Sequence, residues 1–258
     1  MKSAIIYALI PLVAGHGAII KATAPGGGSG MALGVDPDTD RTSTRRNSGQ
    51  QDSTRFKGEA ADTVGETLAG GSNDIDAGTK AIMAMTGDML PQVAAGGEIQ
   101  MTIHQVNDDG AGPYACMLNT DGTATEWTDI QVTQNVPGEA GRNRDGSTTD
   151  FPLNAEIPAG TNCTGTVAGQ ENVCMVRCQN PARAGPFGGV VPVQMPGPNA
   201  TAPNTPAAAR RNLAMAMKRD LQMLKKMVKR ASTLEEEAEE LDMSEEDLAQ
   251  LREDGEEI

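Results

Sequence analysis

The stretch EIQMTIHQV, residues 98–106, alternates apolar with polar side chains. Ile99, Met101 and Ile103 share one face, and His104 falls on the opposite, polar face. Because successive side chains of a β-strand point to opposite faces of its sheet, this alternation predicts a half-buried strand. The Asn-Asp-Asp-Gly sequence that follows is typical of a turn.

Shorter strand patterns follow on the C-terminal side and are separated by Gly, Pro and Asn. Short strands separated by such turn residues favour an all-β fold, an immunoglobulin-like β-sandwich, over an α/β fold. We expect these strands over residues 114–119, 127–134, 151–157, 173–179 and 190–195.

The N-terminal side has a different composition. Residues 23–63 are rich in Gly, Ser, Asp and Arg with little periodicity, which predicts long surface loops. Residues 76–86 predict one short helix that begins at an Asp76 cap and ends at Gly87. Its apolar stripe would consist of Ile75, Ile82 and Met85.

Residues 1–15 have the pattern of a secretory signal peptide. Lys2 precedes an apolar run that is too short to span a bilayer, and small residues lie before His16. We expect the mature chain to begin at His16 and to contain no transmembrane helix; the alternative is a buried N-terminal helix. Glycosylation sequons at Asn162 and Asn199 agree with secretion, although a cysteine stands in the middle of the first.

The sequence contains four cysteines: Cys116, Cys163, Cys174 and Cys178. An even number of cysteines in an exported chain predicts two disulfides, for which three pairings are available. A zinc site built on Cys174 and Cys178 is the alternative, but no histidine lies near them in the sequence.

Charge and composition divide the chain and limit its partners. The formal net charge of −14 argues against nucleic acid and anionic membranes. We expect a β-sandwich domain over residues 16–196 and a Pro/Asn/Thr/Ala linker over 197–209. Residues 210–258 are basic and then acidic, which predicts either a helical hairpin or a disordered, solvated tail.

The two histidines of the chain, His16 and His104, could hold a metal ion. An N-terminal histidine offers an imidazole nitrogen and an α-amine that loses its proton readily near neutral pH. With the imidazole of His104, three nitrogens in one plane would select Cu(II) over zinc, the arrangement called a histidine brace. Phe187 and Tyr114 are the axial candidates. Alternatively, each histidine is an ordinary structural residue.

Six blocks of the sequence resemble the appressorium-associated, Egh-like virulence-factor family of filamentous fungi. The resemblance covers residues 1 to about 196 and implies secretion, an extracellular or cell-surface location, and a role in penetrating host tissue. The blocks are HGAII (16–20), IHQVNDDGAGPY (103–114), QNVPG (134–138), CTG (163–165), VCMVRCQN (173–180) and AGPFGG (184–189).

A second resemblance, to lytic polysaccharide monooxygenases, rests on His16, His104 and Phe187. It implies an immunoglobulin-like sandwich, copper, and oxidative cleavage of a host or fungal cell-wall polysaccharide. Trp127 is the sole tryptophan, so a flat aromatic platform for crystalline polysaccharide is hard to build.

Three functions therefore stay open: a copper-binding protein, a copper-dependent enzyme, and a metal-free adhesive or effector protein. A buried brace would favour the first, and an exposed copper beside a carbohydrate groove the second.

Overall fold

The structure is a computed structural model that describes residues 16–197. The predicted signal peptide, most of the linker, the charged tail and the sequon at Asn199 lie outside the described residues. Within the described part, the fold is all-β with thirteen strands and one α-helix, so the predicted β-sandwich class is confirmed. No helix in residues 16–197 has the length and apolar character needed to cross a membrane.

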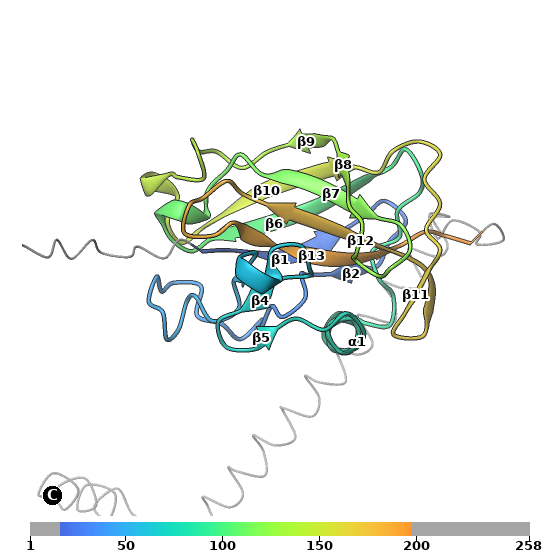
Figure 1. The fold of residues 1–258 in the computed structure, drawn as a ribbon, viewed down its shortest axis with the longest axis horizontal. Coiled ribbons are helices and arrows are strands. Elements are labelled where there is room, and N and C mark those ends of the chain that lie inside the picture. The colour runs from blue at the N-terminus through green and yellow to red at the C-terminus, as the bar shows by residue number, and fades with distance from the viewer. Residues whose placement is uncertain (1–15, 198–258) are drawn as a thin grey trace, which may run out of the picture. The chain divides into compact units, whose positions relative to one another are not determined.

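One layer is an antiparallel sheet built around the strand predicted from the alternating stretch (Figure 1). β6 lies between β1 and β10, and its Ile99, Met101 and Ile103 are buried as predicted. The short strand β2 pairs with the other edge of β1. The strands of this layer are β1 (Gly17–Thr23), β2 (Ser29–Gly30), β6 (Glu98–Gln105), β9 (Val132–Gln134) and β10 (Thr149–Glu156).

The second layer is centred on the longest strand, β12, which pairs with β7, β11 and β13. β8 pairs with the free side of β7. Buried residues of both layers form one hydrophobic core. The strands of this layer are β7 (Ala115–Asn119), β8 (Thr128–Ile130), β11 (Gly165–Val167), β12 (Gln170–Gln179) and β13 (Phe187–Gln194).

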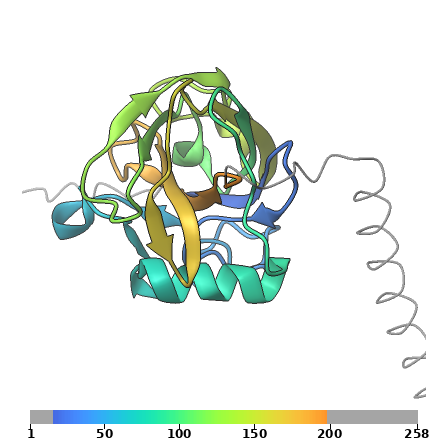
Figure 2. The ribbon, with the colours of Figure 1, turned by 90° about the vertical axis from the view of Figure 1, so that its right-hand side faces the viewer.

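The two layers are joined where β13 runs parallel to β1, with Ala18 opposite Gly188. At the same end, Phe187 pairs with Arg55, so three short strands extend from β13. These are β3 (Thr54–Arg55), β4 (Glu66–Thr67) and β5 (Gly71–Ser72). Figure 2 shows the strands curving round the core, with the helix lying outside them. Three 3₁₀ turns complete the described elements: Gly58–Ala60, Asp108–Gly110 and Arg144–Gly146.

The strand predictions were incomplete: they missed the short strands β2, β3, β4, β5 and β11 as well as β1, and they joined β8 and β9. Residues 127–134 form two strands, because the chain leaves β8 in one layer at Gln131 and enters β9 in the other. β1 was not predicted at all. A register shift between Ile19 and Lys21 interrupts its pairing with β6, and such a bulge breaks the alternation that identifies a strand. Residues 23–63 are mostly loop, as predicted, and after the end of β1 at Thr23 contain only β2, β3 and one 3₁₀ turn.

The helix α1 (Ile75–Thr86) begins one residue earlier than predicted, and its cap lies two residues earlier. Its cap is Asp74, whose carboxylate accepts a hydrogen bond from the Ala77 N–H at 2.7 Å. The predicted cap, Asp76, instead accepts from the Ala168 N–H of the loop after β11. Met85 is 46% exposed and was wrongly placed on the apolar stripe. The predicted end at Gly87 is confirmed, and its φ of 106° suits glycine.

The replacement Asp74→Ala should lower the free energy of unfolding by ~1 kcal/mol, because it removes the side-chain acceptor of an N-cap. In a protein of this size that loss corresponds to a fall of ~2–4 °C in melting temperature. Asp88→Ala, an exposed aspartate just after the helix, is the matched control and should leave the melting temperature unchanged. Equal melting temperatures for Asp74→Ala and wild type would show that this cap does not stabilise the fold.

Candidate metal centre

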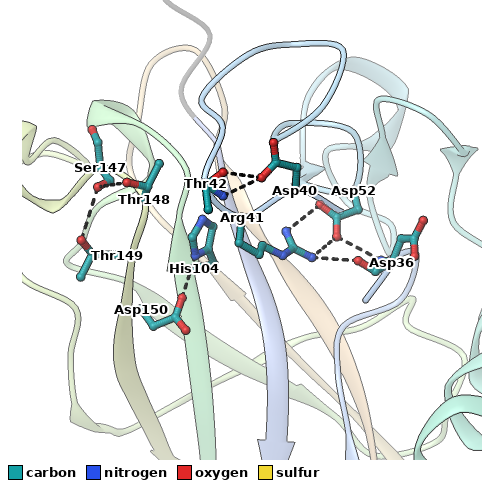
Figure 3. A network of polar contacts seen from close by, with 10 residues as sticks. All are labelled: Asp36, Asp40, Arg41, Thr42, Asp52, His104, Ser147, Thr148, Thr149 and Asp150. Atoms are coloured by element: carbon teal, nitrogen blue, oxygen red, sulfur yellow. Dashed lines mark hydrogen bonds and ion pairs between the residues drawn. The ribbon is translucent and has the colours of Figure 1, made fainter. Parts of the chain in front are cut away.

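His104 is held in one orientation by a neighbouring carboxylate. On β6 it lies opposite Asp150 of β10, and its Nδ1 is 2.6 Å from the Asp150 Oδ1 (Figure 3). A carboxylate oxygen accepts a hydrogen bond, so Nδ1 carries the proton and donates it. His104 is 2% exposed, although it lies on the strand face predicted to be polar. Its Nε2 is buried and has no hydrogen-bond partner among the described residues.

His16 lies beside His104 across the β1–β6 ladder. Ala18 is directly opposite His104, and the Val106 N–H donates to the His16 carbonyl at 2.9 Å. His16 and His104 are therefore diagonal neighbours, a relation in which backbones are typically ~7–8 Å apart. The His16 backbone nitrogen donates to the Asn107 Oδ1 at 2.7 Å. The fold thus brings together His16 and His104, which are 88 positions apart in the sequence.

Two glycines allow the chain to come close at His16. A Cβ on Gly110 would lie 2.0 Å from the His16 carbonyl oxygen, and a Cβ on Gly17 would lie 2.5 Å from the Tyr114 hydroxyl oxygen. Side chains at both positions would collide with these atoms. The close approach of the turn at residues 108–110 to His16 therefore requires glycine at position 110.

Phe187 and Tyr114, the two axial candidates, lie on different sides of the strand. The His16 and Phe187 ring centroids are 4.7 Å apart, with the rings inclined by 33°. The Tyr114 hydroxyl lies against Gly17, whose side-chain direction is opposite to that of Ala18, the residue facing His104. It donates to the Gly110 carbonyl at 2.8 Å, and burial raises the pKa of this tyrosine well above its usual range. The structure thus brings Phe187, and not Tyr114, to the histidine pair.

Asn180, a residue that sequence reasoning missed, ties Phe187 to the turn beneath His16. Its Oδ1 accepts from the Phe187 N–H at 2.9 Å. Its Nδ2 donates to the carbonyls of Asp109 and Ala111 at 2.7 and 2.8 Å. The side chain is 2% exposed, so these bonds form in a water-poor environment where they contribute strongly to order.

The residues present suit a metal that prefers nitrogen ligands. Among residues 16–197 there is no cluster of three or more His, Cys, Asp or Glu side chains that could hold a metal. The nitrogen atoms at this end of the molecule belong instead to the two imidazoles and to the backbone of His16, whose nitrogen is an amide while residue 15 precedes it. A ligating histidine commonly donates its other N–H to a carboxylate, which is the relation of His104 to Asp150. The buried, unpartnered Nε2 is the atom that a metal would satisfy.

All four cysteines are joined in disulfides. Cys116 of β7 pairs with Cys178 of β12, and Cys163 pairs with Cys174 of β12. Disulfide sulfurs do not ligate zinc as thiolates do, so the alternative zinc site on Cys174 and Cys178 was wrong. Asn162 is exposed on the loop before β11, beside the disulfide-bonded Cys163.

A family profile and two known proteins are similar to this chain, and all three are described as virulence factors. A family profile described as Egh16-like virulence factor matches residues 14–188. The appressoria-specific virulence factor GAS1 of Pyricularia oryzae (strain 70-15) is 55% identical over 258 residues, which cover 99% of this chain and 98% of that protein. The appressoria-specific virulence factor GAS2 of the same fungus is 39% identical over 134 residues, which cover 48% of this chain and 46% of GAS2.

Proposed function

Because the chain belongs to the Egh16-like virulence factor family, we propose that it is a secreted, virulence-associated protein that binds one copper ion through His16 and His104. The virulence role is extended from the two relatives, which are named appressoria-specific virulence factors. We link it to host penetration at the cell surface or outside the cell.

Secretion is supported by two features of the chain. Residues 1–15 combine a basic start, an apolar run and small residues before His16, the pattern that signal peptidase removes. The two disulfides suit an oxidising compartment, because thiols stay reduced in the cytosol. Removal of the leader would convert the His16 backbone nitrogen from an amide, which does not bind metal readily, into an amine, which does.

Copper binding is supported by one observation above all. The buried Nε2 of His104 has no partner, while the Asp150 carboxylate fixes the other ring nitrogen and the ladder puts His16 next to it. His16 would contribute its amine and one imidazole nitrogen, and His104 its Nε2. Nitrogen donors of this kind favour Cu(II) among the divalent metals. Copper held there would supply a Lewis-acidic, redox-active centre.

The burial of the site favours binding over turnover as the proposed role. His104 is 2% exposed and its Nε2 is buried, so a metal bound to that atom would have little open surface. Trp127 packs against the core, and the Arg177 guanidinium lies 5.6 Å from its ring. A partly buried tryptophan with a guanidinium over its ring is a poor platform for a crystalline polysaccharide. A copper-dependent monooxygenase activity therefore ranks second.

A single residue added before His16 should weaken Cu(II) binding by at least ~10-fold, because the added residue turns the α-amine ligand into an amide. The measurement is calorimetric titration of two proteins, one beginning at His16 and one at Gly-His16. Mass spectrometry of the secreted chain supplies its first residue and any bound metal.

The two proteins differ only at the N-terminus, so each controls for the fold of the other. Equal affinities would contradict the brace. A protein that begins at His16 and takes up no copper would support the metal-free adhesive or effector function.

A further inference from the structure

A cavity of about 250 Å³ lies beside His16, at the edge made by β3, β4 and β5. His16 lines it together with residues of these strands, with Ser53 just before β3 and with Leu68 of the turn between β4 and β5. Its volume is below the ~300–1,000 Å³ typical of clefts for drug-sized ligands. The cavity therefore has room for one small unit, and it adjoins the histidine that begins the proposed mature chain.

Ser53 gives the cavity wall a polar group that needs a partner. The residue is 2% exposed, and its hydroxyl has no hydrogen-bond partner among the described residues. A buried hydroxyl left unpaired costs free energy, which a ligand with its own hydroxyl group would recover. A hydroxyl rotates freely and can both donate and accept a hydrogen bond. It therefore favours a ligand that forms hydrogen bonds, whether or not that ligand is charged.

The charged residues of the cavity neutralise each other. The Arg55 guanidinium donates to the Glu66 carboxylate through Nε, at 3.2 Å, and through Nη2. The pair leaves further N–H donors on Arg55 and a second oxygen on Glu66. Thr67 adds another hydroxyl, which accepts from the Gly70 N–H at 3.1 Å. Apart from His16, the wall has no net charge and mixes donors with acceptors, which suits a neutral ligand rich in hydroxyl groups.

We propose that this cavity binds one neutral, hydroxyl-rich sugar unit of a polysaccharide. Leu68, which is 38% exposed, lines the cavity together with His16 and would contact the C–H face of the sugar. The hydroxyls of the unit would pair with Ser53, Thr67 and the Arg55–Glu66 pair. The inference rests on the proposed function, since it gives a ligand to the end of the molecule that would hold copper.

The test is calorimetric titration of metal-free protein, beginning at His16, with two neutral oligosaccharides and one anionic one. The neutral probes are four-unit chains of β-1,4-linked glucose and of β-1,4-linked N-acetylglucosamine, and the anionic probe is tetragalacturonate. At least one neutral probe should bind at ~10 mM or below, and tetragalacturonate should not. Leu68→Trp should weaken binding by at least ~10-fold by filling the cavity, and Ser53→Ala by ~2–10-fold through one lost hydrogen bond.

Met89→Trp is the matched control, because Met89 is 37% exposed and lies outside this cavity. It should bind the sugar like wild type. The inference is overturned if neither neutral probe binds, if only tetragalacturonate binds, or if Leu68→Trp binds as well as Met89→Trp. Circular dichroism melting of each variant excludes loss of the fold as the cause.

Copper titration of the same Ser53→Ala protein separates this inference from the proposed function. Copper uptake without sugar binding in the wild type refutes the sugar site alone. Sugar binding without copper uptake refutes the metal site alone. Ser53→Ala should retain full copper affinity, since the hydroxyl is not among the three proposed ligands.

Discussion

The replacement His104→Ala should abolish stoichiometric Cu(II) uptake, with an affinity at least ~100-fold below that of the wild-type chain beginning at His16. The variant loses the buried nitrogen that would close the site, and the sequence offers no third histidine to replace it. Asp150→Ala should give an intermediate loss of ~10–100-fold, because it removes the carboxylate that orients the ring but leaves the ligand in place. Isothermal titration calorimetry measures both.

Thr102→Ala controls for changes on the same strand. Thr102 lies two residues before His104 on the same face of β6 and should bind copper like wild type when replaced. The removed imidazole is small relative to the core, so the disulfide-bonded fold should persist and can be followed by circular dichroism. Equal uptake by His104→Ala and wild type would eliminate His104 as a ligand.

Removal of the Cys116–Cys178 disulfide should lower the free energy of unfolding by ~4 kcal/mol, and removal of Cys163–Cys174 by ~3 kcal/mol. The first closes a loop of 62 residues in the unfolded chain and the second a loop of 11, and longer loops lose more entropy when they are closed. The first also joins directly opposite residues of β7 and β12. Urea unfolding of the two double alanine variants measures the difference.

Each double variant is the control for the other, because both remove two buried sulfurs from β12 or its neighbours. The native chain should be the most stable and the Cys116→Ala/Cys178→Ala chain the least. The reverse order would show that local packing, and not loop closure, sets the contribution of these disulfides.

The sequence predicted the fold best where local pattern alone decides structure. The alternation of Ile99, Met101 and Ile103 located β6, and Gly87 located the end of α1. It failed at β1, where the bulge after Ile19 breaks the alternation. Two aspartates stand at the start of α1, and tertiary structure determines their roles, because Asp76 is engaged by Ala168.

The candidate metal site was also predictable only in part, because tertiary structure determines which residues lie beside the histidines. Two histidines in a chain of this length are few enough to name as candidates. Asp150 could not be singled out from 35 acidic residues, because only the β6–β10 register brings it opposite His104. Likewise, Phe187 and Tyr114 were equal candidates until the strands assigned them to different sides of β1.

The parallel pairing of β1 with β13 has a consequence for how the chain is made. β1 begins at residue 17 and β13 at residue 187, so the first strand to leave the ribosome cannot complete its sheet until the last has been synthesised. Contacts so distant in sequence slow folding, since a long loop must be closed before they form. The nascent chain therefore leaves the start of that edge of β1 unpaired until β13 has been made, and an unpaired strand edge can pair with other chains.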